Sequence, residues 1–349
     1  MTAPTNTPLN NPPADYCPPG SARWFTIPEG SDAGKTLFYF DHQSAPAAPA
    51  ATVVFAHGNP ESSYTYRHVR ERLLQSSASL RVIGVDHVGF GLSDQATFEM
   101  VDMHHAANLR QLVHELDLHD VTLVVHDWGG PIGVGAFIDE PQRVRNLVVM
   151  NTTIFPMPSD GITYENFPMA WMPWSKTPAL VPDALWGGVA AHVVSRGEPQ
   201  SSARFLLGVS ATTLRYALGQ IADETPEGVW SSPMRSRANA KSSKRNVRQT
   251  PHWGHGYRYE DPTLGVQDNH AFYANMQDKV PRVWRDIGAA GHFGSWDACG
   301  KASVIRQWHE ALPGMVDRTH VYPHHGHFIE EYEGAEIALS ILRLNGASS

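Results

Sequence analysis

The chain has 349 residues, of which 42% are hydrophobic and 18% charged, so it can bury a sizeable core as one large domain with an insertion or as two modest domains. Its formal net charge of -8 argues against a nucleic-acid-binding surface, because such a surface needs clustered Lys and Arg. No stretch reaches the roughly 20 apolar residues of a membrane span, and two cysteines, Cys17 and Cys299, are too few for the disulfide framework of a small secreted domain.

The N-terminal residues 1–21 are rich in Pro, Asn and Thr, a composition typical of an extended or disordered segment. They lack the basic start and the apolar run of a signal peptide, so we expect a cytoplasmic protein without a membrane partner. Residues 22–30 and 35–43 then predict a β-hairpin that opens the domain.

Strand and helix alternate with short links over the next hundred residues. Buried strands are predicted at 51–56, 80–86, 121–126 and 144–151. Helices are predicted between them, at 66–77, 103–118 and 130–140. This order is typical of a parallel sheet that is covered by helices on both faces.

The alternation fails between residues 155 and 280, where Met, Trp, Pro and Phe are frequent and further helical pieces follow. We interpret 155–280 as an inserted helical cap. Alternation resumes at 281, with a helix at 304–314, a strand running into a turn at 318–328 and a last helix at 335–344. The predicted core therefore comprises 22–154 and 281–349.

One strand end carries a carboxylate. The sequence VTLVVHDWGG (121–130) predicts a buried strand that breaks into a sharp turn at Asp127. Ligands of parallel sheets bind outside the carboxyl ends of the strands. Asp127 could be a helix N-cap, but Asp297 and His327 follow it in the order nucleophile, acid and base that α/β hydrolases use.

Four sequence blocks favour the interpretation of Asp127 as a nucleophile: HGNPESSYTYR (57–67), VDHVGFGLSD (85–94), VVHDWGG (124–130) and GHFIEE (326–331). In these blocks the chain resembles the haloalkane dehalogenases of the α/β-hydrolase superfamily. The resemblance implies the α/β-hydrolase fold, with a mostly parallel eight-stranded sheet, flanking helices and an inserted helical cap.

The resemblance also implies a mechanism. Asp127 would attack the halogen-bearing carbon of a small apolar substrate and form an ester, and Asn59 and Trp128 would bind the released halide ion and later the oxyanion. His327, oriented by Asp297, would activate water to cleave that ester. This combination resembles the subfamily with an Asp-His-Asp triad and an Asn-Trp halide pair. No cofactor, metal or nucleic acid is implied, and a homo-oligomer is left open.

Two other functions remain open at this level. Epoxide hydrolases share the turn at Asp127; Asn59 favours a dehalogenase, whereas Glu61 is commoner among epoxide hydrolases. Ring-opening tyrosines could come from the cap, where Tyr164, Tyr216, Tyr257, Tyr259 and Tyr273 are available. The third reading is a catalytically inactive relative that binds a ligand in the same pocket.

Asp297 is the least constrained of the three predicted catalytic residues, because the preceding segment is long and rich in Gly. Asp286 is the alternative candidate for the acid. An alignment on Gly288 would place Gly291, which is not an acid, at the position of the acid. Asn151 occupies a third position, at which some dehalogenases carry an acid.

Three further features are open. The cap aromatics Phe167, Trp171, Trp174 and Trp186 could line a pocket or form the core of the cap. The basic stretch 235–249 is interpreted as a solvated face or a mobile loop, and His324 and His325 lack the carboxylate or cysteine cluster of a metal site.

Overall fold

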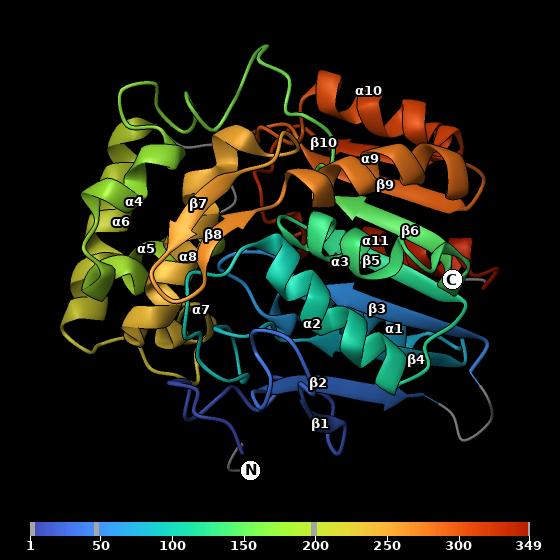
Figure 1. Ribbon diagram of the computed structural model, residues 1–349, viewed down its shortest axis with the longest axis horizontal. Coiled ribbons are helices and arrows are strands. Elements are labelled where there is room, and N and C mark those ends of the chain that lie inside the picture. The colour runs from blue at the N-terminus through green and yellow to red at the C-terminus, as the bar shows by residue number, and fades with distance from the viewer. Residues whose placement is uncertain (1–3, 45–48, 197–200, 348–349) are drawn as a thin grey trace.

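The computed structural model describes residues 4–44, 49–196 and 201–347 and is built on an eight-stranded sheet (Figure 1). Its strand order is β1-β2-β4-β3-β5-β6-β9-β10. The strands are β1 (Ala22–Thr26), β2 (Thr36–Gln43), β3 (Ala51–Ala56), β4 (Leu80–Val85), β5 (Val121–His126), β6 (Val144–Met150), β9 (Gly288–Gly294) and β10 (Thr319–Tyr322). The hairpin β1-β2 joins antiparallel to β4, and the strands from β4 to β10 pair in parallel, so the predicted mostly parallel eight-stranded sheet is confirmed.

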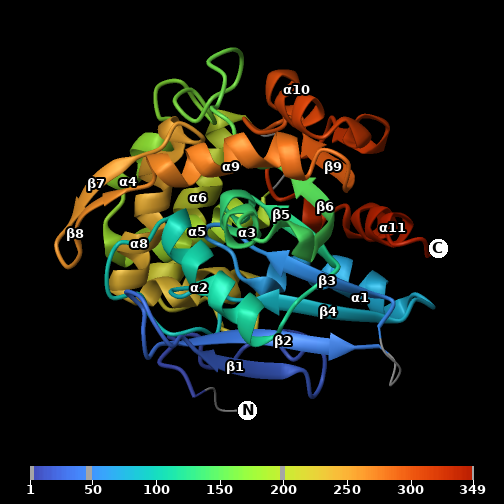
Figure 2. The same ribbon diagram turned by 45° about the vertical axis from the view of Figure 1, so that its right-hand side comes forward.

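Helices cover both faces of this sheet (Figure 2). One face carries α2 (Asp102–Glu115), α3 (Gly129–Phe137), α9 (His270–Val283) and α10 (Ala302–Ala311), and the other carries α1 (Arg67–Gln75) and α11 (Gly334–Leu344). The alternation of strand and helix predicted from the sequence is therefore found in the structure.

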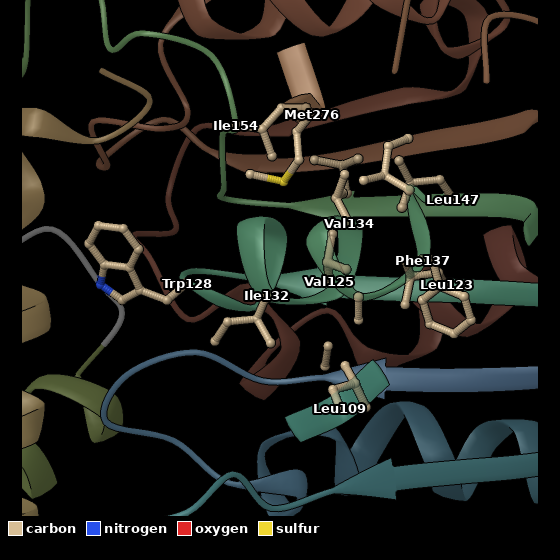
Figure 3. Close-up of a cluster of buried hydrophobic side chains, with 14 of the residues drawn as sticks. Leu109, Leu123, Val125, Trp128, Ile132, Val134, Phe137, Leu147, Ile154 and Met276 are labelled. Carbon is tan, nitrogen blue, oxygen red and sulfur yellow. The ribbon is translucent and has the colours of Figure 1, made fainter. Parts of the chain in front are cut away.

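The apolar sequence of β5 follows from its place between these layers. Successive residues of a strand point to opposite faces, so Leu123 and Val125 pack with α2 and α3, whereas Val124 packs with α1 and α11. Figure 3 shows the hydrophobic cluster on the face that carries α2 and α3, in which Leu109 and Phe137 lie near Leu123 and Val125. All residues of β5 are buried, because helices cover both faces of the sheet, and the strand therefore does not alternate between apolar and polar residues.

Except for α9, the helices and the hairpin between β6 and β9 stand beyond the carboxyl ends of the strands, at the left of Figure 1. They are α4 (Thr177–Leu180), α5 (Trp186–Ser195), α6 (Ser202–Ala217), α7 (Pro226–Ser231), α8 (Arg237–Gln249) and a hairpin of β7 (Arg258–Asp261) and β8 (Gly265–Asp268). The hairpin interrupts a region predicted to be helical. Helix α9 begins within the predicted range of the cap but packs with α3 and α10 on the sheet, and the cap boundaries at 155 and 280 stay a prediction.

The mobile-loop interpretation of the basic stretch 235–249 is wrong, because this stretch forms helix α8. Its small polar face is buried: Ser242 Oγ accepts a hydrogen bond from the Met100 N–H (3.1 Å), and Asn246 Nδ2 donates to the Met100 carbonyl (3.2 Å). Lys244 pairs with Asp183 at 2.7 Å. Only the opposite face of the helix is solvated.

Residues 4–21 form no helix or strand, but they are hydrogen-bonded along the surface of the molecule. Thr5 and Thr7 donate through their hydroxyls to the carbonyls of Leu92 (2.7 Å) and Gly91 (2.6 Å). The N–H of Asn10 donates to Asp223 in the segment between α6 and α7 (2.9 Å). Within the described ranges, no helix is both long and apolar enough to cross a membrane.

Candidate active site

Asp127 occupies a sharp turn between β5 and α3. Its φ is +51°, in the left-handed region that non-glycine residues rarely adopt. Close packing explains two glycines at this turn: a Cβ atom at Gly129 would lie 2.0 Å from the Ala56 carbonyl oxygen, and one at Gly58 would lie 2.2 Å from the side-chain Oδ1 of Asp127. The turn therefore projects the carboxylate beyond the edge of the sheet.

The loops after β9 and β10 bring Asp297 and His327 to this carboxylate. Nε2 of His327 lies 2.9 Å from Oδ2 of Asp127, and Nδ1 lies 2.9 Å from Oδ2 of Asp297, the second contact being an ion pair rather than an aligned hydrogen bond. The imidazole ring thus stands between two carboxylates, as a nucleophile-base-acid arrangement requires.

The other positions considered for the acid lie elsewhere. Asp286 is exposed in the turn before β9, at the opposite end of that strand, and Gly291 lies within β9. Asn151 donates from Nδ2 to the carbonyls of Gly326 (2.9 Å) and His327 (2.6 Å). Asn151 therefore holds the backbone of the histidine loop rather than the imidazole ring.

The two carboxylates control the charge of His327. Burial alone would lower the pKa of this imidazole, but Asp297 and Asp127 together raise it well above its usual value. Asp297 is itself held in place, because the Cys299 N–H donates to its Oδ1 at 2.8 Å. The two carboxylates therefore favour the protonated form of the imidazole.

Asn59 and Trp128 flank the carboxylate of Asp127. The backbone N–H of Asn59 donates to Oδ1 of Asp127 at 2.6 Å. The side chains of Asn59 and Trp128 both line the pocket above the carboxylate, and Oδ1 of Asn59 is buried without a hydrogen-bond partner. The indole of Trp128 stacks on that of Trp253 with 4.0 Å between ring centroids.

The pocket above the carboxylate is largely aromatic. Beside Asp127, His327, Asp297, Asn59 and Trp128, it is lined by Tyr164, Phe167, Pro168, Trp174, Val193, Arg196, Phe205, Thr250, Trp253, Trp296 and Phe328. The predicted cap aromatics separate into three environments: Phe167 and Trp174 line the pocket, Trp186 is buried in the cap with its Nε1–H donating to Ser243 (2.8 Å), and Trp171 is exposed.

Sequence reasoning missed two groups of residues at this site. Trp253 lies in the region predicted to be the cap, where no motif or spacing marks it, and Tyr164 was predicted only as a possible ring-opening tyrosine and not as a partner of Asp297. Glu61, His126 and Glu330 form a buried cluster directly behind Asp127, with ligand-type atoms within 4.8 Å of one another. All three stand inside the motifs quoted above, but the motifs alone do not show that they meet.

Comparison with known proteins agrees with this geometry. Residues 51–331 match the family model described as the alpha/beta hydrolase fold. The chain belongs to this family. The matched range contains the loop of Asn59, the turn of Asp127 and the loop of His327.

Two curated relatives match a shorter part of the chain. A cis-3-alkyl-4-alkyloxetan-2-one decarboxylase of Xanthomonas campestris is 36% identical over 128 residues, 34% of this chain and 40% of the relative. A haloalkane dehalogenase of Mycolicibacterium smegmatis is 35% identical over 152 residues, 42% of this chain and 46% of the relative. The chain therefore spans less than half the length of the curated relatives it matches.

Among solved structures, a haloalkane dehalogenase from Agrobacterium tumefaciens covers 96% of this chain and 99% of its own, with a TM-score of 0.64 and 18% sequence identity. This likeness shows the shared fold. Together with the curated relative, it confirms the predicted resemblance to haloalkane dehalogenases.

Proposed function

We propose that the protein hydrolyses the carbon–halogen bond of small apolar haloalkanes through a covalent ester on Asp127. One observation carries the proposal: a carboxylate, rather than a hydroxyl, stands at the strained turn, 2.9 Å from an imidazole and beneath an aromatic pocket. A serine attacking a haloalkane would leave a stable ether, whereas a carboxylate leaves an ester that water can cleave.

In the first step, Asp127 displaces the halide in line. A carboxylate is a weak nucleophile in water, so an apolar pocket favours the attack. The halide is received by two neutral donors, the Asn59 amide and the Trp128 indole N–H. Among the ion pairs of residues 4–44, 49–196 and 201–347, Asp127 pairs with His327 and with no Arg or Lys, so its charge stays available for attack.

The second step is the hydrolysis of the ester, and it depends on the loss of the negative charge of Asp127. Ester formation removes the negative charge of Asp127, which is one of the causes of the raised pKa of His327. The pKa of His327 then falls, so the ring releases its proton to solvent, and the neutral ring can take a proton from the attacking water. The backbone N–H groups of Asn59 and Trp128 stabilise the oxyanion, a contribution of about 3 kcal/mol for each donor.

Tyrosine geometry favours dehalogenation over epoxide opening. Of the five cap tyrosines named above, only Tyr164 lines the pocket, and its hydroxyl contacts Asp297. Tyr273 donates to Asp102 in the core, and Tyr259 donates to the Glu99 carbonyl. A paired ring-opening donor is therefore lacking among the described pocket residues.

A second candidate is the decarboxylation of an alkyl-substituted oxetan-2-one in the same pocket. The observation that favours it is the 36% identity to the Xanthomonas decarboxylase. The alkyl groups of such a substrate would suit the same aromatic pocket.

Halide release from 1-bromobutane and 1,2-dibromoethane tests the proposal. We expect release by the wild type, none by Asp127→Ala, and unchanged release by Asp286→Ala, whose carboxylate is exposed away from the site. Dehalogenation would be contradicted if the two bromoalkanes released no halide while a dialkyl oxetan-2-one or styrene oxide was turned over. No turnover of any of these would favour the inactive ligand-binding relative. A cytoplasmic location and a homo-oligomer stay predictions.

A further inference from the structure

Three buried side chains stand behind the catalytic groups, each within three residues of Asn59, Asp127 or His327. Glu61 follows Asn59 by two residues, His126 directly precedes Asp127, and Glu330 follows His327 by three. Their exposed fractions are 1%, 0% and 0%. The mechanism proposed above assigns no task to them.

These side chains contact one another directly. Nδ1 of His126 lies 2.8 Å from Oε1 of Glu61 and 3.5 Å from Oε1 of Glu330. The Gly58 N–H donates to Oε2 of Glu61 (2.7 Å), and the Thr65 hydroxyl donates to Oε1 of Glu330 (2.7 Å). Oε2 of Glu330 is buried without a hydrogen-bond partner.

The location of the protons follows from one contact. Nε2 of His126 lies 2.8 Å from the carbonyl oxygen of His327, and a carbonyl can only accept, so Nε2 carries the hydrogen. Burial lowers the pKa of His126, which leaves the ring neutral and Nδ1 unprotonated. The hydrogen between Nδ1 and Oε1 must then belong to Glu61.

The carboxyl groups can supply this proton. Burial raises the pKa of Glu61, and the charge of Asp127 raises it further. Burial and the neighbouring Glu61 raise the pKa of Glu330 to about 8. Among the ion pairs of the described residues, neither carboxyl has an Arg or Lys partner; the groups that face them are His126, Asp127, His327 and the neutral Tyr66.

We propose that Glu61, His126 and Glu330 form a proton-sharing brace that positions the Asn59, Asp127 and His327 loops, and that the brace holds only while the carboxyl pair keeps a proton. When both carboxyls are ionised they repel each other and Asp127, and Glu61 no longer donates to His126. The loops then lose their common support. The kinetic consequence rests on the proposed function; the structural consequence does not.

Amide replacements test the brace, because glutamine keeps the size and hydrogen bonding of glutamate without titrating. We would record kcat and KM from about pH 6 to about pH 10 for wild type, Glu330→Gln and Glu61→Gln. Glu336→Gln, the same change at an exposed site on α11, is the matched control.

In the wild type and the control, kcat should fall above about pH 8. In Glu330→Gln we expect kcat at neutral pH within about threefold of wild type and an alkaline limb shifted upward by about one pH unit or more. Glu61→Gln should shift in the same direction. Profiles that overlay that of wild type, or a loss that is equal at every pH, would overturn the proposal.

Stability and infrared spectra test the brace without a substrate. A buried acid with a raised pKa stabilises the fold fully below its unfolded pKa and loses this contribution as the pH rises through its folded pKa. The advantage in Tm of Glu330→Gln over wild type should therefore grow between about pH 5 and about pH 8. Wild type should show a protonated-carboxyl C=O band at neutral pH that weakens in both glutamine variants.

These readouts separate the two proposals. If no substrate is turned over, the proposed function has failed, and Tm and the infrared band still decide the brace. An advantage in Tm that is independent of pH, together with an unchanged band, would overturn it. One equivalent of a tightly bound divalent metal in the purified protein, found by elemental analysis and lost in both variants, would also overturn it, because the three ligand atoms would then hold an ion instead of a proton.

Discussion

The phenolic oxygen of Tyr164 lies 3.3 Å from Oδ2 and 3.4 Å from Oδ1 of Asp297. A residue of the cap thus contacts the acid that pairs with His327. The ring of Tyr164 stacks on Trp253, and Trp253 stacks on Trp128. Substrate-lining and catalytic groups are therefore joined across the two parts of the molecule.

Removing this hydroxyl tests the link. Tyr164→Phe keeps the ring stacking but removes the hydrogen bond that Tyr164 donates to Asp297. We expect this to cost about 1 kcal/mol of transition-state stabilisation, or about fivefold in kcat, with KM nearly unchanged. Steady-state kinetics measure the change. Tyr216→Phe, in the cap but outside the pocket, should behave as wild type; an equal loss in both variants would contradict the link.

The assignment of Asp297 can be tested by removing its charge alone. Asp297→Asn should lower the pKa of His327, because Asp297 is the main cause that raises it, and should slow ester hydrolysis by about 10³-fold or more. Mass spectrometry should then detect the alkylated protein during turnover. Asp286→Asn is the control, and accumulation of the ester there instead would reassign the acid.

The raised pKa of His327 predicts how stability depends on pH. A protonated imidazole between two carboxylates stabilises the fold fully below its unfolded pKa of about 6.5, and the contribution is lost as the pH rises through the higher folded pKa. The difference in unfolding free energy between wild type and His327→Gln should therefore shrink above about pH 6.5. Denaturation at several pH values measures it, and a constant difference from acid to alkaline pH would refute the ion-pair account.

Halide binding should depend on the indole N–H of Trp128. Trp128→Phe keeps an aromatic ring but loses a donor to an anion, a loss of about 1.5–3 kcal/mol, so the bromide Kd should rise about tenfold to a hundredfold. Titration calorimetry with bromide measures this. Trp171→Phe changes an exposed cap residue and should leave the Kd unchanged; bromide affinity retained in Trp128→Phe would remove Trp128 from the halide site.

Sequence reasoning located the core well because its signals are local. The strands β3, β5 and β6 are short apolar runs, and the turn at Asp127 is marked by the glycines that its backbone needs. The order of Asp127, Asp297 and His327 then followed from strand ends. The roles of these residues remain proposals, although the structure brings all three together.

The cap resisted prediction for a physical reason. Helix α8 buries Asn and Ser side chains whose hydrogen bonds go to the backbone of residues 96–100, so it shows no apolar stripe. Likewise, Glu61 and Glu330 were assigned no buried role, because glutamate is usually exposed. Only the fold reveals that they meet at His126.

Residues 4–11 connect two regions that are far apart in the sequence. Their hydrogen bonds begin on the Gly91–Leu92 loop of the core and end on Asp223. This short stretch therefore links the core of the molecule to the segment between α6 and α7. Its removal by a protease would leave every strand of the sheet in place but would remove these hydrogen bonds between the two regions.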